Sequence, residues 1–183
     1  WPVPGLCAAG SCARVDRTLG GVVGTTAGWT SESTGQDAIM LACGDVTGDG
    51  LRELFITDNT QLGGSGRFRQ YNGLVGGGFN SSYDWSYYDG YGSALALADI
   101  DGDGDLDLAT GAWWDYARFF RNDGGSFGAT DNWRSGATSV VEKIVFADVN
   151  NDGLRTATEV FTESAGPTRY LAHQPVQRVL SVR

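Results

Sequence analysis

A chain of 183 residues has the length of one ordinary domain, and its 41% hydrophobic residues are enough to form a core. No apolar run is long enough for a membrane-spanning helix, so we expect no membrane insertion, and the net charge of −9 disfavours nucleic acid as a partner. The 28 glycines, and apolar runs that soon reach turn residues, favour many short strands over helices. The expected fold class is therefore all-β.

The N-terminal stretch, residues 1–35, begins at Trp1 without a signal-like apolar segment, so we expect a mature or trimmed sequence. Cys7 and Cys12 flank four residues of alanine, glycine and serine. This spacing permits a small disulfide-closed loop, and a pair of reduced thiols is the open alternative. Cys43 lies farther along, in an apolar strand.

Three copies of one pattern follow each other along the chain. In each copy a tryptophan stands 14 to 16 residues before the first aspartate of an Asp-rich loop. The pairs are Trp29 and Asp45, Trp85 and Asp99, and Trp133 and Asp148. An apolar segment precedes every loop, at residues 38–42, 94–98 and 140–147, and we expect each segment to form a buried inner strand.

Further strand-like segments follow each loop, and the second copy shows them most clearly. An apolar stretch at 108–110 leads to an Arg/aromatic strand at 118–121 and a Gly-rich turn at 122–125. Four short strands per copy, with spacings of 54 and then 49 residues between loops, are typical of β-propeller blades. We expect one repeat domain over residues 1–183, a β-propeller of about three four-stranded blades. Its parts are a half blade at 1–35 and blades at 36–86, 87–135 and 136–183.

The second Asp-rich loop carries the strongest chemical signal in the sequence. Its carboxylates alternate along nine residues: Asp99, Asp101, Asp103, Asp105 and Asp107. Alternation directs oxygens from successive odd positions inward, Asp105 offers its backbone carbonyl, and Gly104 permits the sharp turn. Turns of aspartate and glycine also form without metal, but five carboxylates in nine residues repel one another unless a cation lies among them. We therefore expect a Ca²⁺ site in this loop.

The first Asp-rich loop keeps Asp45, Asp49 and Glu53 at the corresponding positions, with Gly50 at the turn. Its third position is Thr47, which offers a hydroxyl or a water-mediated ligand in place of a carboxylate. The loop has one formal charge fewer, so we expect it to bind calcium more weakly.

The third loop offers Asp148, Asn150, Asp152 and Glu159 as ligands. Alignment of the acids makes Glu159 the counterpart of Glu53, with residues 156–158 inserted before it. An alternative keeps the nine-residue spacing and uses Thr156 as the ligand. The spacing also fits a twelve-residue EF-hand loop, but no amphipathic helix pattern flanks it.

Residues 98–108, the turn at 121–125 and the segments that begin at the three tryptophans resemble the FG-GAP/VCBS repeat family. The resemblance extends over about residues 13–172. It implies a β-propeller in which each calcium loop joins the first two strands of a blade, and therefore up to three bound Ca²⁺. The family occurs in integrin α-subunit propellers, in secreted bacterial proteins and in fungal sugar-binding propellers, so the resemblance implies a secreted or extracellular protein.

About three blades are fewer than a closed propeller ring requires. The outer faces of the first and last blades would then lack neighbours. The chain is therefore expected to be either a fragment of a longer protein or a protomer of a homo-oligomer that completes the ring, such as two chains with six blades.

Catalysis finds little support in the sequence. His173 is the only histidine and has no nucleophile at a catalytic spacing, so we expect a surface histidine and no enzyme activity. Trp29, Trp85 and Trp133 recur at one repeat position and are expected to pack between blades. The ligand candidates are the aromatic residues that do not recur: Trp113, Trp114 and Tyr116.

The sequence therefore predicts a secreted or cell-surface calcium-binding module that acts in adhesion or in the binding of protein or, in the manner of a lectin, of carbohydrate. Two alternatives stay open, namely the propeller portion of a polysaccharide-degrading enzyme and a structural unit of a larger assembly. An assay for polysaccharide cleavage separates the enzyme from the binding module.

Overall fold

The computed structural model describes residues 14–19, 22–32, 36–147, 156–160, 169–171 and 179–181. Several residues that the sequence singles out lie outside these ranges: Cys7, Cys12, Asp148, Asn150, Asp152 and His173. Within the ranges, regular structure is β-strand apart from one short 3₁₀ helix, η1 (Thr60–Leu62). The expected all-β class is confirmed. None of the helical structure described is long and apolar enough to cross a membrane.

Four antiparallel sheets contain the strands of the described residues, and in each sheet the neighbouring strands are also neighbours in sequence. The first sheet pairs β1 (Arg14–Leu19) with β2 (Val22–Thr30). The second contains β3 (Leu41–Gly44), β4 (Glu53–Ile56), β5 (Arg67–Tyr71) and β6 (Trp85–Tyr88). The third contains β7 (Gly92–Ala98), β8 (Asp107–Ala112), β9 (Arg118–Phe120) and β10 (Trp133–Arg134). The fourth contains β11 (Lys143–Ala147), β12 (Thr156–Val160), β13 (Arg169–Leu171) and β14 (Val179–Ser181).

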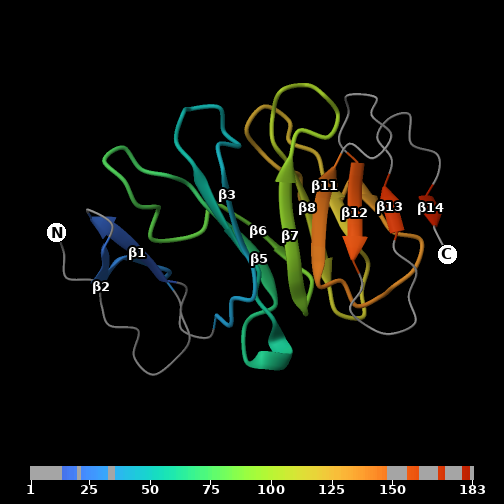
Figure 1. Cartoon of the computed structure of the whole chain (residues 1–183), viewed down its shortest axis with the longest axis horizontal. Helices are drawn as coiled ribbons and strands as arrows, with labels where there is room; N and C mark the ends of the chain where they lie inside the picture. Colours follow the sequence, from blue (N-terminus) through green and yellow to red (C-terminus); the bar gives the residue numbers. More distant parts are fainter. Residues whose placement is uncertain are drawn as a thin grey trace.

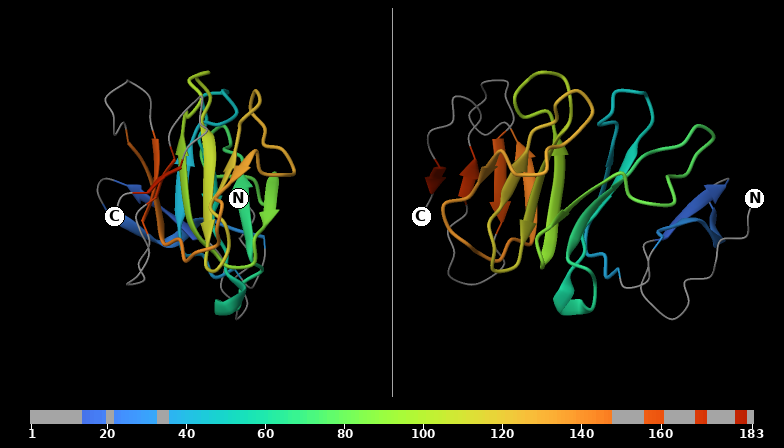
Figure 2. Two further views of the ribbon diagram at one scale, coloured as in Figure 1. Left: turned by 90° about the vertical axis from the view of Figure 1, so that its right-hand side faces the viewer. Right: turned by 180° about the vertical axis from the view of Figure 1, so that it is seen from behind.

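The sheets stand one after another from the N-terminal to the C-terminal side of the molecule (Figures 1 and 2). The first strand of the third sheet, β7, lies beside both β3 and β11. Three four-stranded sheets thus follow a two-stranded one, which is the plan that the sequence repeats predict.

An apolar cluster fills each space between neighbouring sheets. The central strand β4 supplies two of these clusters, because alternate side chains of a strand point to opposite faces. Leu54 and Ile56 pack toward Trp29 of the first sheet, whereas Phe55 packs toward Leu108 of the third. Each large apolar side chain buried in this way contributes about 1.5–3 kcal/mol to folding. The sheets are therefore held face to face by burial on both sides of their central strands.

Two of the recurring tryptophans, Trp29 and Trp85, contact the following sheet. The indole of Trp29, in β2, packs edge-on against Tyr71, with 4.9 Å between ring centroids, and its Nε1 donates to the carbonyl oxygen of Asn80 over 3.0 Å. The indole of Trp85, in β6, packs in the same manner against Phe120 at 5.4 Å, and its Nε1 donates to the carbonyl oxygen of Gly128 over 3.1 Å. The expectation that these two tryptophans pack between repeats is confirmed.

Candidate metal centre

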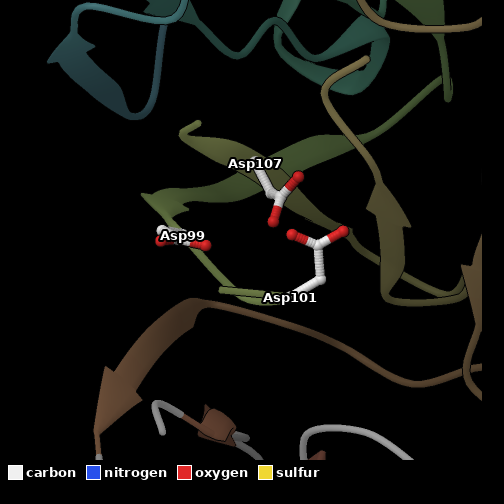
Figure 3. A group of neighbouring side chains, drawn as sticks. All are labelled: Asp99, Asp101 and Asp107. Atoms are coloured by element: carbon white, nitrogen blue, oxygen red, sulfur yellow. The ribbon is translucent and has the colours of Figure 1, made fainter. Parts of the chain in front are cut away.

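The second Asp-rich loop joins β7 to β8, the position that the family resemblance implies. Three of its carboxylates, those of Asp99, Asp101 and Asp107, each place an oxygen within 4.8 Å of the others. Figure 3 shows the three side chains turned toward one shared space inside the loop. Among the described residues, these three acidic side chains form a group whose spacing suits a metal ion.

Backbone amides hold the first aspartate of this loop in place. Asp99 accepts a hydrogen bond from the Gly102 amide at Oδ1 over 2.7 Å and one from the Gly104 amide at Oδ2 over 3.1 Å. Both glycines have positive φ angles, 80° and 99°, which other residues rarely adopt. The chain therefore curls around the Asp99 carboxylate and leaves it facing the centre of the loop.

The closing aspartate of the loop, Asp107, is fully buried. Its Oδ2 accepts from the Ile100 amide over 2.9 Å and its Oδ1 from the Asn122 amide over 2.8 Å. Burial raises the pKa of the Asp107 carboxyl, the two backbone hydrogen bonds oppose that shift, and the nearby Asp101 and Asp103 add to it. Additional positive charge at this point would favour the ionised carboxylate.

The first Asp-rich loop, between β3 and β4, repeats this arrangement. Asp45 accepts from the amides of Gly48 and Gly50 over 2.8 Å and 2.9 Å. The closing acid, Glu53, is fully buried and accepts from the Val46 amide over 2.8 Å. Its other oxygen has a longer contact, 3.5 Å, with the Gly73 amide. The two loops therefore share one backbone framework.

The third position distinguishes the two loops. In the first loop it is Thr47, whose hydroxyl oxygen is buried and has no hydrogen-bond partner among the described residues. In the second loop it is Asp101, whose carboxylate faces the other acids of the group (Figure 3). The two loops therefore differ in side-chain charge at this position, neutral in the first and negative in the second.

Two predicted ligands of the second loop lie outside the three-carboxylate group. Asp103 accepts at Oδ1 from the amide of Asp105 over 3.0 Å, and its Oδ2 lies 3.6 Å from Nη2 of Arg121. The described contacts of Asp105 involve its backbone amide, and its carboxylate makes none of them. The carboxylate of Asp105 is thus not needed to explain the loop.

The strand register of the fourth sheet bears on the third loop. In the first two loops the closing acid pairs with the last residue of the preceding strand, Glu53 with Gly44 and Asp107 with Ala98. In the fourth sheet Thr156 takes this place, opposite Ala147, and Glu159 pairs with Ile144 farther along the ladder. Because the ladder from Ala147 onward has no break, the register has no insertion before Glu159 and agrees with the nine-residue alternative.

The residue that sequence reasoning missed is Asn122, which follows β9 and is fully buried. Its side-chain Nδ2 donates to the Val46 carbonyl over 2.7 Å and to the Leu106 carbonyl over 3.0 Å, and its Oδ1 accepts from the Gly125 amide over 2.8 Å. Because its own amide also binds Asp107, Asn122 connects the first loop to the second. Its place in the turn at 121–125, one of the stretches that carry the family resemblance, is the signal that was available.

The aromatic ligand candidates lie in the connection from β8 to β9, whereas the metal loop connects β7 to β8 at the other end of the sheet. Trp114 is 57% exposed and has φ of 59°, an uncommon value for a residue with a side chain. It packs edge-on against Trp113 and Tyr91, with centroid distances of 5.9 Å and 5.7 Å. Tyr116 instead has the guanidinium groups of Arg118 and Arg134 over its ring, 5.6 Å and 5.7 Å from the ring centroid. The structure therefore groups Trp113 and Trp114 with Tyr91, whereas the described contacts of Tyr116 are with arginines.

A buried ion pair lies on this side of the third sheet. Arg118 donates to the buried Asp89 carboxylate and, over 3.1 Å, to Asp115. Burial raises the pKa of Asp89 to about 7, Arg118 opposes that shift, and Asp115 and Asp131 add to it. Charged and aromatic side chains are thus adjacent here, away from the metal loops.

The fold and the loops define a protein of repeated four-stranded antiparallel sheets with an acidic loop between the first two strands of a sheet. Residues 45–110 match the family model described as an FG-GAP-like repeat. The matched part, which is thus similar to an FG-GAP-like repeat, runs from Asp45 of the first loop through the whole second loop. No curated protein matches the chain.

Proposed function

We propose that this chain is a β-propeller-type repeat module that binds Ca²⁺ in its Asp-rich loops, most tightly in the second. The observation that carries the proposal is the convergence of Asp99, Asp101 and Asp107 on one space. Ca²⁺ takes its oxygen ligands at 2.3–2.6 Å, so two ligand oxygens on one ion are at most about 5 Å apart. The 4.8 Å limit on the carboxylate oxygens fits that geometry.

The chemistry of the ligands favours calcium over zinc. The group offers carboxylate oxygens alone, whereas structural zinc sites are built from cysteine and histidine. Bound Ca²⁺ would supply positive charge to carboxylates that otherwise repel each other, and its role would be to stabilise the fold. In the first loop Asp45, Asp49 and Glu53 would hold the ion, with the Thr47 hydroxyl as the neutral ligand.

The proposal is tested by thermal unfolding of the full chain with Ca²⁺ and with a chelator. Ligand that binds only the folded state raises the melting temperature, so the chelator should lower it. Asp99→Asn should reduce the difference between the two conditions, whereas Asp105→Asn should preserve it. Melting curves that coincide with and without chelator would refute calcium binding.

A second proposed function is carbohydrate binding by the exposed aromatic group of Trp113, Trp114 and Tyr91, with adhesion outside the cell as its setting. The observation that favours it is the exposure of Trp114 together with its uncommon backbone conformation, because strained residues are concentrated at functional sites. Aromatic faces stack against the apolar faces of sugar rings, and the nearby Asp115 would accept hydrogen bonds from hydroxyl groups.

Binding to a panel of immobilised glycans tests this second function. Trp114→Ala should abolish retention of the chain, and Tyr88→Ala provides the matched control because Tyr88 is equally exposed, at 58%, on the last strand of another sheet. If neither the natural chain nor the Tyr88 variant binds any glycan, carbohydrate binding is wrong and a protein ligand remains to be tested. Incubation of the same glycans with the chain, followed by analysis for shorter products, tests the polysaccharide-degrading alternative.

We also propose that the row of sheets is completed into a closed propeller, either by a longer polypeptide or by other copies of the chain. The supporting observation is that neighbouring sheets bury both faces of their central strands, so a sheet at either end needs a neighbour. The mass of the chain in solution tests completion by copies. A monomer at all concentrations would exclude the homo-oligomer.

A further inference from the structure

We propose that Arg121 is a built-in counter-cation of the second loop, which neutralises its carboxylates without calcium and lowers the affinity of the loop for calcium. The inference rests on the proposed calcium binding and adds a residue that regulates it. It concerns how strongly the loop depends on the metal.

The position of the guanidinium group is the first observation. Arg121 Nε lies 3.0 Å from Asp101 Oδ2, and Nη2 lies 3.6 Å from Asp103 Oδ2. Asp101 belongs to the three-carboxylate group, and Asp103 is one of the two loop aspartates that lie outside it. Arg121 therefore already pairs with two carboxylates that a bound calcium ion would use.

The corresponding position of the preceding repeat is the second observation. Leu54 pairs with Tyr71 in the second sheet, and Leu108 pairs with Phe120 in the third. The residue after Tyr71 is Asn72 and the residue after Phe120 is Arg121, so a neutral side chain replaces the cation in the first repeat. The second loop therefore has an arginine that the first loop lacks.

The two loops differ in charge at two positions: the third ligand position and the residue that follows the third strand. The first loop has three carboxylates at its four ligand positions, because Thr47 is neutral, and the neutral Asn72 follows its third strand. The second loop has a fourth carboxylate, Asp101, and the positive Arg121 follows its third strand. Counted over these positions, both loops have a formal charge of about −3. At the ligand positions the extra acid of the second loop is thus offset by a cation, although over the whole loops the second stays the more negative, because it also contains Asp105 whereas the first contains Arg52.

Calcium must therefore compete with a cation that is covalently part of the chain. A divalent ion among the loop carboxylates would repel the guanidinium group through Coulomb interaction. Asp123 offers that group another partner, because Arg121 Nε already lies 3.3 Å from Asp123 Oδ1, and Asp123 is well exposed. Arg121 is itself half exposed, so its side chain has room to shift toward Asp123.

The test compares Arg121→Gln with the natural chain by calorimetric titration with Ca²⁺ at low ionic strength. Removal of one positive charge at this distance should tighten the strongest site about tenfold. In the absence of calcium, the same variant should melt at a lower temperature, because the loop carboxylates lose their counter-cation. Added salt should reduce the difference in affinity, since it screens the half-exposed charge.

Arg134→Gln is the matched control. It removes the same positive charge from the same sheet. Arg134, however, forms an ion pair with Asp131, and in the strand register it lies opposite Arg118, at the end of β9 away from Arg121. Its calcium affinity should remain within about twofold of the natural value. A general effect of net charge would instead tighten binding equally in both variants and would overturn the inference.

Three further outcomes would overturn the inference. If Arg121→Gln weakens calcium binding, the arginine orders the carboxylates for the ion, and if the affinity is unchanged, the arginine does not compete with calcium. In both cases the inference is wrong while calcium binding stands. If the natural chain shows no calcium binding at all, the inference and the proposed calcium site both fail.

Discussion

The first and second Asp-rich loops have the same backbone hydrogen bonds but different side chains. In both, two glycine amides bind the first aspartate and a backbone amide binds the buried closing acid. The third position changes from Thr47 to Asp101 without altering these bonds. The first and last acids therefore build the loop, whereas the residues between them set its charge.

The largest expected effect is that of Asp107→Asn. An amide at this buried position cannot accept from both the Ile100 and the Asn122 amides in the way that the carboxylate does, so the free energy of unfolding should fall by about 2–3 kcal/mol. Glu53→Gln should have a smaller effect, because the contact of Glu53 with the Gly73 amide is long. Urea denaturation in chelator measures both. Equal losses would show that the two closing acids are not distinguished by their second hydrogen bond.

Asn122→Ala should have the next largest effect, about 1–3 kcal/mol, because it leaves the Val46 and Leu106 carbonyls without their side-chain donor. Since Asn122 contacts both loops, the variant should also weaken calcium binding in both. Asn80→Ala is the control, because the Asn80 side chain lies in an exposed turn and bonds to Asp84. Calorimetry that shows weakening at one site alone would contradict a connection between the loops.

Replacement of one predicted ligand in each loop tests how ligand charge affects calcium affinity. Asp103→Ala should weaken calcium binding by about 10–100-fold, whereas Thr47→Ala should weaken it only a few-fold, because a carboxylate attracts the ion far more than a hydroxyl does. Titration of each variant with Ca²⁺ gives the two ratios. Similar ratios would mean that Asp103 is not a direct ligand, consistent with its place outside the three-carboxylate group.

The smallest effect is expected in the third loop, where the register places Thr156 at the closing position. Thr156→Glu restores an acid at that place and should tighten a weak calcium site about tenfold or less. Glu159→Gln should leave that site unchanged, since Glu159 lies farther along β12. A loss of one calcium ion from Glu159→Gln would support the alignment of Glu159 with Glu53 after all.

The sheets and the acidic loops were predictable because their signals are local. Short apolar runs of strand-like residues and the alternation from Asp99 to Asp107 are visible within about ten residues of sequence. The recurrence of Trp29 and Trp85 at one repeat position also predicted their packing between sheets, which the aromatic contacts confirm.

The connections between repeats were not predictable from the sequence alone. The Asn122 side chain reaches Val46 across 76 residues, and nothing near either residue indicates the other. Tyr91 and Trp113 lie on opposite sides of the second loop in sequence, yet the Trp113 amide donates to the Tyr91 carbonyl. In the third loop, alignment of the acids favoured Glu159 as the closing residue. The strand register places Thr156 there instead, and sequence similarity does not reveal which residues pair across a ladder.

The indole contacts of Trp29 and Trp85 give the row of sheets a direction. The first and second sheets each provide an indole donor on the last strand, and the second and third sheets each provide an acceptor carbonyl between the third and fourth strands, at Asn80 and Gly128. A unit that has both elements joins its predecessor and its successor by the same bond. Duplication of one such unit within the gene would therefore lengthen the row without the evolution of any new contact.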